Sequence, residues 1–309
     1  MFQEIIGNDK NKAILEKAIQ NHNLLHSYLF VGREGIGKKM MARQFAKKIL
    51  CLKPDSDMDQ KCESCTMFDG ENHPDYHEIR PDGNTIKIEQ IRQMNASVME
   101  KPIISKYKIF VIDDCDKMTK EAQNCLLKTL EEPPIYVIIL LICSQENQLL
   151  STIQSRCTKL QFYPLTDEEL KQYLLKQQME PLPDHLLRLA EGSIQGLARV
   201  TQDQDILNQL VDTVEHITQM DQMEFFKKNE YLYQEKDRMN HILEYWNVLW
   251  YDQLNKQNAA EQFHTIQCIQ IIEETKKRIR SNCNFDMCVD YLLFEMWEEF
   301  HEKYNRSSL

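Results

Sequence analysis

Two short motifs in this sequence contain residue types that bind phosphate groups. Residues 32–38 read Gly-Arg-Glu-Gly-Ile-Gly-Lys, which is the spacing of a phosphate-binding loop. In such a loop the backbone amides at the start of a helix turn toward the phosphates, and the lysine reaches the terminal phosphate groups. Residues 155–157 read Ser-Arg-Cys. This turn would present the Arg156 guanidinium, whose planar fork matches phosphate oxygens, to a phosphate on another molecule.

The phosphate-binding loop lacks the residue that normally holds magnesium. Position 39 is lysine, where Ser or Thr would supply a hydroxyl ligand. An ammonium group cannot ligate a cation, and it adds positive charge where the metal would lie. The loop therefore predicts a nucleotide-binding fold, but it is a poor predictor of ATP hydrolysis. Its candidate residues are Gly32, Gly35, Gly37, Lys38 and Lys39.

Two further positions weaken the same predicted site. Asp113 follows an apolar stretch and stands where a magnesium-coordinating acid belongs. Asp114 stands where a longer glutamate would polarise water. Residues 192–196 resemble a lid motif in which related ATPases carry an arginine, but Gln195 occupies that position. Arg156, in contrast, is intact. The asymmetry predicts an idle site in this chain and an arginine offered to a neighbour, although a surface salt bridge is the alternative role for Arg156.

The predicted secondary structure that would position these residues changes near residue 163, from alternating strands and helices to helices only. Up to there, short apolar strands alternate with helices, which predicts an α/β domain with a largely parallel sheet. After Pro164 the pattern is helical only, and it begins with a capping box from Thr166 to Glu169. The expected strands are 27–31, 76–79, 108–112 and 136–142, and the expected helices include 38–50, 120–131 and an apolar-spaced segment from 88 to 98. Apolar stripes at 242–254 and at Ile266, Ile269 and Ile272 predict helical core, with part of them facing partner subunits.

Composition excludes several classes of protein. The chain has 309 residues, 42% hydrophobic and 28% charged, with a formal net charge of −11. That charge argues against a dedicated nucleic-acid binder, because phosphate affinity needs clustered Lys and Arg. No run of 18 apolar residues occurs and the first residues do not form a signal peptide, so we expect a cytoplasmic protein with reduced cysteines and no membrane segment.

The chain resembles the delta-prime subunits of the bacterial DNA polymerase III clamp loader, members of the AAA+ family. The resemblance rests on His-Ser-Tyr-Leu-Phe at 26–30, Asn-His-Pro-Asp at 72–75, Leu-Leu-Lys-Thr-Leu-Glu-Glu-Pro-Pro at 126–134 and Ser-Arg-Cys at 155–157. It implies an AAA+ domain over 1–163, a helical lid over 164–204 and a helical collar over 205–309. It also implies a hetero-pentameric ring with the gamma/tau ATPase and delta subunits, which loads a sliding clamp onto primed DNA, with Arg156 acting as an arginine finger on a neighbour.

Two other functions remain open at this stage. The first is an ATP-hydrolysing motor subunit of the gamma/tau type, in which Lys38 and Asp113 suffice and Lys39 is tolerated. The second is an unrelated nucleotide kinase or NTPase with the same loop, which residues 126–134 and the helical C-terminal third disfavour. The residues give no support to polymerase or exonuclease chemistry of the chain itself.

Three cysteines resemble the zinc module of the same family. Cys51, Cys62 and Cys65 match three of its four ligand positions, but the fourth position is Phe68. Structural zinc takes four ligands in a tetrahedron, so Asp69 or His73 would have to complete the set. The alternative is a loop of three reduced thiols that has lost its metal. Both hypotheses are open on the sequence.

Overall fold

The computed structural model describes residues 2, 4–53, 62–254 and 259–301. It divides into two compact units, here called the first and the second unit. The first comprises residues 1–181 and 191–196, and the second comprises residues 182–190 and 197–309. The finer division into lid and collar stays a prediction.

A five-stranded parallel sheet forms the centre of the first unit. Its order is β2-β3-β4-β1-β5, and every neighbouring pair is parallel. The strands are β1 (Ser27–Val31), β2 (Tyr76–Ile79), β3 (Lys108–Ile112), β4 (Val137–Cys143) and β5 (Thr158–Gln161). The expected strands are confirmed, with β4 starting at Val137 and not at residue 136. Strand β5 was not expected, because Leu160 is its one fully buried residue.

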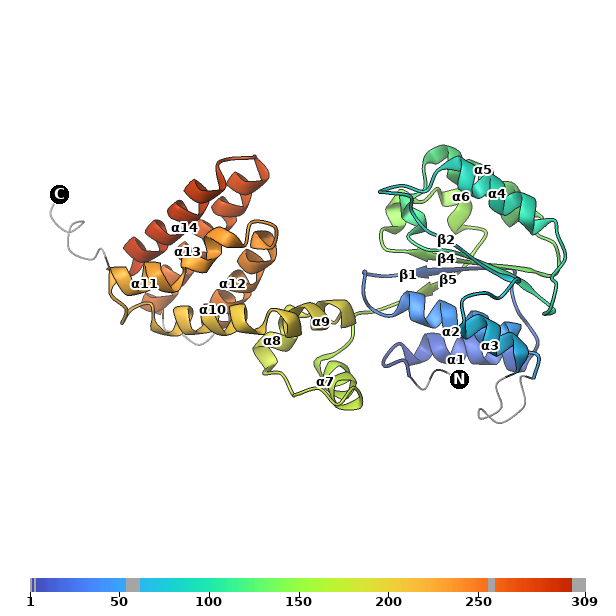
Figure 1. The fold of residues 1–309 in the computed structure, drawn as a ribbon, viewed down its shortest axis with the longest axis horizontal. Helices are drawn as coiled ribbons and strands as arrows, with labels where there is room; N and C mark the ends of the chain where they lie inside the picture. The colour runs from blue at the N-terminus through green and yellow to red at the C-terminus, as the bar shows by residue number, and fades with distance from the viewer. Residues whose placement is uncertain (1, 3, 54–61, 255–258, 302–309) are drawn as a thin grey trace. The chain divides into compact units, whose positions relative to one another are not determined.

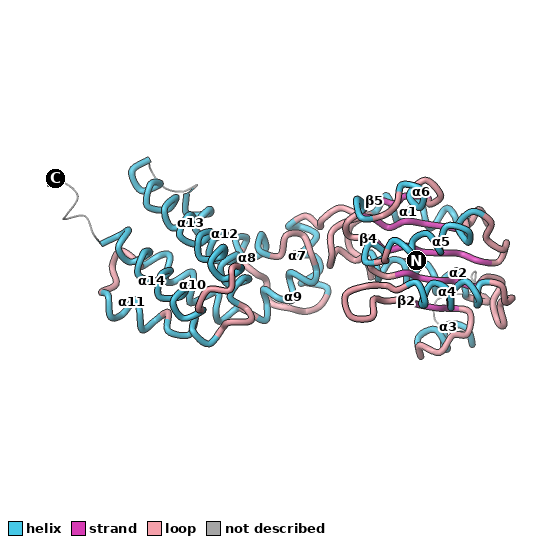
Figure 2. Tube along the Cα trace, turned by 90° about the horizontal axis from the view of Figure 1, so that it is seen from above, coloured by secondary structure: helices cyan, strands magenta, loops and turns pink. Residues whose placement is uncertain are grey.

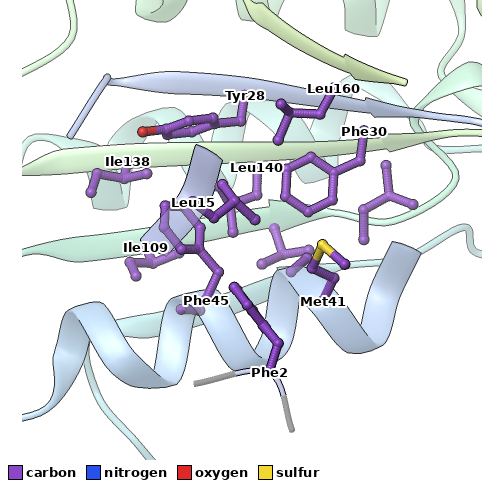
Figure 3. Close-up of a cluster of buried hydrophobic side chains, with 14 of the residues drawn as sticks. Phe2, Leu15, Tyr28, Phe30, Met41, Phe45, Ile109, Ile138, Leu140 and Leu160 are labelled. Atoms are coloured by element: carbon purple, nitrogen blue, oxygen red, sulfur yellow. The ribbon is translucent and has the colours of Figure 1, made fainter. Parts of the chain in front are cut away.

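Helices cover both faces of this sheet (Figure 1). One face carries α1 (Asp9–Gln20), α2 (Lys38–Leu50) and α3 (Glu63–Asp69), and the other carries α4 (Ile88–Val98), α5 (Lys120–Glu131) and α6 (Ser151–Gln154). Alternate strand residues point to opposite faces. In β1, Tyr28 and Phe30 therefore join the core under α2, whereas Leu29 joins the core under α5. Figure 3 shows Tyr28 and Phe30 on the strand side of that first core, with Met41 and Phe45 of α2 beneath them.

Helices account for the regular structure that follows β5, as the cyan segments of Figure 2 show. The expected capping box is confirmed at the start of α7 (Asp167–Lys176), where Thr166 and Glu169 cap each other. In the second unit, Trp246 and Trp250 are buried as expected, whereas Ile266 is 42% exposed and lies outside the core. The remaining helices are α8 (Asp184–Leu189), α9 (Ile194–Gln202), α10 (Gln204–His216), α11 (Gln222–Lys228), α12 (Met239–Leu254), α13 (Ala259–Arg280) and α14 (Phe285–His301).

This is the expected fold class, an α/β domain with a parallel sheet followed by helices. Within the described residues, the helices are too short or too polar to cross a membrane.

Candidate functional site

The predicted phosphate-binding loop connects the end of β1 to the start of α2. Lys38 is buried at the start of that helix, and its Nζ donates to the carbonyl oxygens of Gly32 at 2.6 Å and Arg33 at 2.5 Å. Burial lowers the pKa of Lys38, and nearby acidic groups oppose that effect. The lysine expected to reach a terminal phosphate is thus hydrogen-bonded to the loop's own backbone.

Lys39 lies between two carboxylates. Its Nζ is 2.6 Å from Asp113 Oδ2 and 2.7 Å from Glu78 Oε1. Burial by itself would lower the pKa of Lys39, but the two carboxylates outweigh it and the pKa is raised. The ammonium therefore remains charged, and it already neutralises Asp113, the acid expected to coordinate magnesium. This donor set does not fit a magnesium ion, since a cationic side chain fills the space beside the carboxylate.

Glu78 is a site residue that the sequence reasoning missed. It belongs to β2 and is paired in parallel register with Val111 of β3, two residues before Asp113. Neighbouring parallel strands end at the same edge of a sheet, so this position could have been found from the strand order. Burial raises the pKa of Glu78, but its bonds to Arg80 and Lys39 outweigh burial and lower the pKa.

Asp114 is also neutralised by a lysine. Its backbone adopts a left-handed conformation with φ 51°, and its Oδ2 lies 2.7 Å from Lys117 Nζ. This hydrogen bond raises the pKa of Lys117. The next acid, Asp116, is buried and accepts the backbone N–H groups of Ser144 at 3.0 Å and Gln145 at 3.2 Å. Both carboxylates are occupied by partners of this chain.

The segment 191–196 lies directly on the loop. The Ile194 N–H donates to the Gly35 carbonyl at 3.0 Å, and Arg33 pairs with Glu191 at 3.0 Å. A Cβ added at Gly35 would collide with Ser193 Oγ and lie 2.8 Å from the Cβ of Gln195. The structure thus brings Gln195 to the loop, and the side chains packed directly against Gly35 are the uncharged Ser193 and Gln195.

Arg156 lies at the opposite edge of the sheet. Its carbonyl accepts a hydrogen bond of 2.7 Å from Ser27 Oγ, and Ser27 is the first residue of β1. The loop leaves β1 after Val31, the last residue of the strand. At a rise of about 3.3 Å per residue, the strand separates the two by roughly 15 Å. Arg156 therefore has no access to the loop of its own chain.

The guanidinium of Arg156 is held by three acceptors, of which Ser155 Oγ is the most distant at 3.5 Å from Nη1. Its Nη2 lies 2.7 Å from Glu131 Oε1, and its Nη1 donates to the Thr152 carbonyl at 2.8 Å. The side chain remains 34% exposed. The salt bridge considered as an alternative role is thus present, between two partly exposed groups. Such a pair contributes little to stability.

The three module cysteines form one group. The sulfur of Cys51 lies 3.8 Å from that of Cys62, and the sulfurs of Cys51, Cys62 and Cys65 all lie within 4.8 Å of one another. Burial raises the pKa of Cys62, but hydrogen bonds from the Cys65 and Leu52 backbones outweigh it and bring the pKa to about 7. Three thiols with one acidic member suit zinc as ligands.

No fourth ligand joins these cysteines among the described residues. Phe68 is buried in the core of the sheet. His73 bonds Ser64 Oγ at 2.9 Å through Nε2 and accepts the Asp75 N–H at 3.1 Å through Nδ1, while Asp69 pairs with Lys47 at 2.5 Å. The described residues therefore bring together three thiols, one ligand fewer than a structural zinc site takes.

Comparisons with known proteins agree with these features. The family model "DNA polymerase III, delta subunit" matches residues 7–166. DNA polymerase III subunit delta' of Bacillus subtilis is 30% identical over 92% of this chain and 94% of its own length. DNA polymerase III subunit tau/gamma of Haemophilus influenzae is 31% identical over 69% of this chain but 33% of its own length. A solved structure, the DNA polymerase III gamma subunit-related protein of Thermotoga maritima, covers 94% of this chain and 99% of its own with 18% identity and a TM-score of 0.48.

Proposed function

The chain belongs to the delta-prime family of DNA polymerase III subunits, and from this premise we propose that it works in a clamp loader without hydrolysing ATP itself. In this proposal it supplies Arg156 to the nucleotide bound by a neighbouring subunit. One observation carries the proposal: Arg156 and the phosphate-binding loop lie at opposite ends of β1. At that end of β1, Arg156 can contact a phosphate only if the phosphate is bound by another molecule.

The loop of this chain supports the non-hydrolysing part of the proposal. Magnesium normally bridges the phosphates and neutralises developing charge during phosphoryl transfer. Here Lys39 neutralises Asp113 at 2.6 Å, and Lys117 neutralises Asp114 at 2.7 Å. The chain's residues therefore hold no place for the metal, and no hydrolytic step is assigned to them.

Exposed apolar side chains at the same edge as Arg156 support contact with a protein partner. Ile135, two residues before β4, is 97% exposed. Ile103 is 75% exposed, and its backbone N–H is held at 2.6 Å by the carboxylate of Asp75, just before β2. Singly exposed apolar side chains are common on protein surfaces, so these two add to the argument from Arg156 and do not carry it alone. We assign this edge to the neighbouring gamma/tau-type ATPase.

The wider assembly in the proposal is a cytoplasmic hetero-pentameric ring with gamma/tau and delta subunits. Through it the chain takes part in placing a sliding clamp on primed DNA. The net charge of −11 favours DNA contacts shared with other subunits over a strong site on this chain. A zinc ion on Cys51, Cys62 and Cys65 would be structural and weakly held, because one ligand is missing from the described set.

The second candidate function, an ATP-hydrolysing motor of the gamma/tau type, shares the loop and Asp113. Lys39 is the residue that disfavours it, because a motor needs the magnesium that this ammonium excludes. The match to tau/gamma proteins also spans a smaller share of this chain than the match to delta'.

ATP turnover by the purified chain separates the two functions. We expect turnover at the background rate, and the same rate from a Lys38→Ala variant. Turnover above background that is lost in Lys38→Ala would support the motor. Capture of the chain by its gamma/tau and delta counterparts would then test membership of the complex.

A further inference from the structure

Arg156 is held by Glu131, which belongs to the segment 126–134 that contributes to the family resemblance. Glu131 is the last residue of α5, in the stretch that ends with Pro133 and Pro134. Its Oε1 lies 2.7 Å from Arg156 Nη2, and the Thr152 carbonyl accepts from Nη1 at 2.8 Å. Glu131 and Arg156 are 25 positions apart in the sequence. The segments 126–134 and 155–157 thus meet at the guanidinium.

Both sides of this contact are fixed by the fold. On the α5 side, Leu126 and Leu130 are buried, and Thr129 donates to Asn95 Oδ1 at 2.8 Å. On the other side, Ser27 holds the carbonyl of Arg156 at 2.7 Å and Ile153 is buried. The ion pair therefore joins two anchored backbones, and its geometry is set by the core.

We infer that Glu131 is the positioning residue for Arg156, and this inference rests on the proposed function in trans. A free arginine side chain has many rotamers, and ordering one of them on binding opposes association. Glu131 on Nη2 and Thr152 on Nη1 restrict the guanidinium beforehand, and Ser155 Oγ is a weaker third acceptor at 3.5 Å from Nη1. The side chain remains 34% exposed, so other N–H groups of the fork can meet a phosphate. Positioning of this kind acts on the rate of the chemical step, because reacting groups must be held within a fraction of an ångström.

If Glu131 were an inhibitor of Arg156, its removal would change the ATPase rate in the opposite direction. If Glu131 competed with the phosphate for Arg156, removing its charge would free the arginine and raise the ATPase rate. The geometry favours positioning, because acceptors on both terminal nitrogens orient the plane of the guanidinium. A competitor would need only to occupy the side of the guanidinium that binds phosphate.

The matched pair for the test is Glu131→Gln and Glu132→Gln. Both remove one negative charge from adjacent positions, and among the described contacts the ion pair to Arg156 belongs to Glu131. Each variant is assembled into the clamp-loader complex, and clamp- and DNA-stimulated ATPase is measured per assembled complex in wild-type and Arg156→Ala backgrounds. Melting temperature and assembly are recorded in parallel.

We expect Glu131→Gln to lower kcat by about two- to threefold, which is less than the severalfold loss expected for Arg156→Ala, with KM within about twofold. Glu132→Gln should stay near wild type. In the Arg156→Ala background, Glu131→Gln should cause no further loss of ATPase rate, because the effects of mutating two residues that act together are not additive. Equal effects of Glu131→Gln and Glu132→Gln, a raised rate, or additive losses would overturn the inference while leaving the proposed function intact. An Arg156→Ala complex with wild-type ATPase would overturn both.

Discussion

The ammonium nitrogen of Lys39 lies 2.6 Å from Oδ2 of Asp113. A cation that belongs to the chain therefore neutralises the acid that would hold magnesium in an active site of this fold. Glu78 joins from the neighbouring strand at 2.7 Å from the same nitrogen. The site is thus satisfied without metal or nucleotide, and its residues contribute to the stability of the domain.

Replacing Lys39 by serine should expose this relationship. Two partly buried carboxylates would lose their cation, so we expect the free energy of unfolding to fall by about 1–2 kcal/mol. The serine hydroxyl and the carboxylates would then suit a divalent cation, so millimolar magnesium should raise the melting temperature of Lys39→Ser by about 2–4 °C. Lys10→Ser, at an exposed position of α1, is the control. An equal effect of magnesium on the melting temperatures of wild type, Lys39→Ser and Lys10→Ser would contradict the proposal that Lys39 takes the place of the metal.

The ion pair also predicts a pH dependence. Burial raises the pKa of Glu78, but Arg80 and Lys39 outweigh it and lower the pKa below the ordinary 4.5. Because the folded pKa is depressed, the stabilisation is present above about pH 4.5 and is lost as pH falls through the folded pKa. The stability difference between wild type and Glu78→Gln should therefore shrink between pH 6 and pH 3 in urea titrations. Glu89→Gln, at an exposed position, should show no such trend. A difference that grows on acidification would refute this assignment.

The closure of the loop by segment 191–196 makes Gly35 and Gly37 unequal. Both have positive φ, 76° and 90°, but a Cβ at Gly35 would collide with Ser193 whereas a Cβ at Gly37 has nothing within 4 Å. Both alanine variants therefore incur the backbone cost, and Gly35→Ala should lose about 1–3 kcal/mol more through overpacking. Urea unfolding of the two variants measures this difference. Equal losses would mean that the segment does not rest on the loop.

The cysteine group predicts a weak metal site. Asp69 is paired with Lys47, and His73 with Ser64, so neither completes the set of three thiols. We expect elemental analysis of the purified, dialysed chain to give less than one zinc per chain, and Cys62→Ser to abolish binding of added zinc. Asp69→Asn should leave zinc content unchanged. A full equivalent of tightly held zinc in wild type and in Asp69→Asn would show that another group supplies the fourth ligand.

Strands β1 and β3 and helix α2 of the first unit were predictable, because their apolar pattern and the turn residues beside them indicate the same structure. β1 and β3 are apolar runs followed by turn residues, and helix α2 begins directly after the glycine-rich loop. α3 was not expected, since its seven residues follow no long apolar period. The exposure of Ile266 could not be predicted, because helical spacing identifies an apolar face without showing which of its residues are covered.

The site was predictable in its residues but not in its contacts. Lys39, Asp113 and Asp114 could be identified from spacing, yet the contact with Glu78 depends on the parallel register of β2 with β3. The contact between Arg156 and Glu131 depends on where α5 ends above the sheet. Both arise from tertiary structure, and local sequence patterns contain no direct signal for either.

The most direct test of the central claim is the ATPase rate of the assembled clamp loader with Arg156→Ala. The variant should fold, keep its melting temperature within a few degrees and assemble normally, because its salt bridge is partly exposed. Clamp- and DNA-stimulated ATPase and clamp loading should fall severalfold. That loss is less than the roughly 10³–10⁵ that arginine fingers can contribute, because one of several nucleotide sites borders this chain in the proposed ring. Arg156→Lys should rescue poorly, since an ammonium keeps the charge but loses the two-point contact. An assembled Arg156→Ala complex with wild-type ATPase and clamp loading would contradict the account.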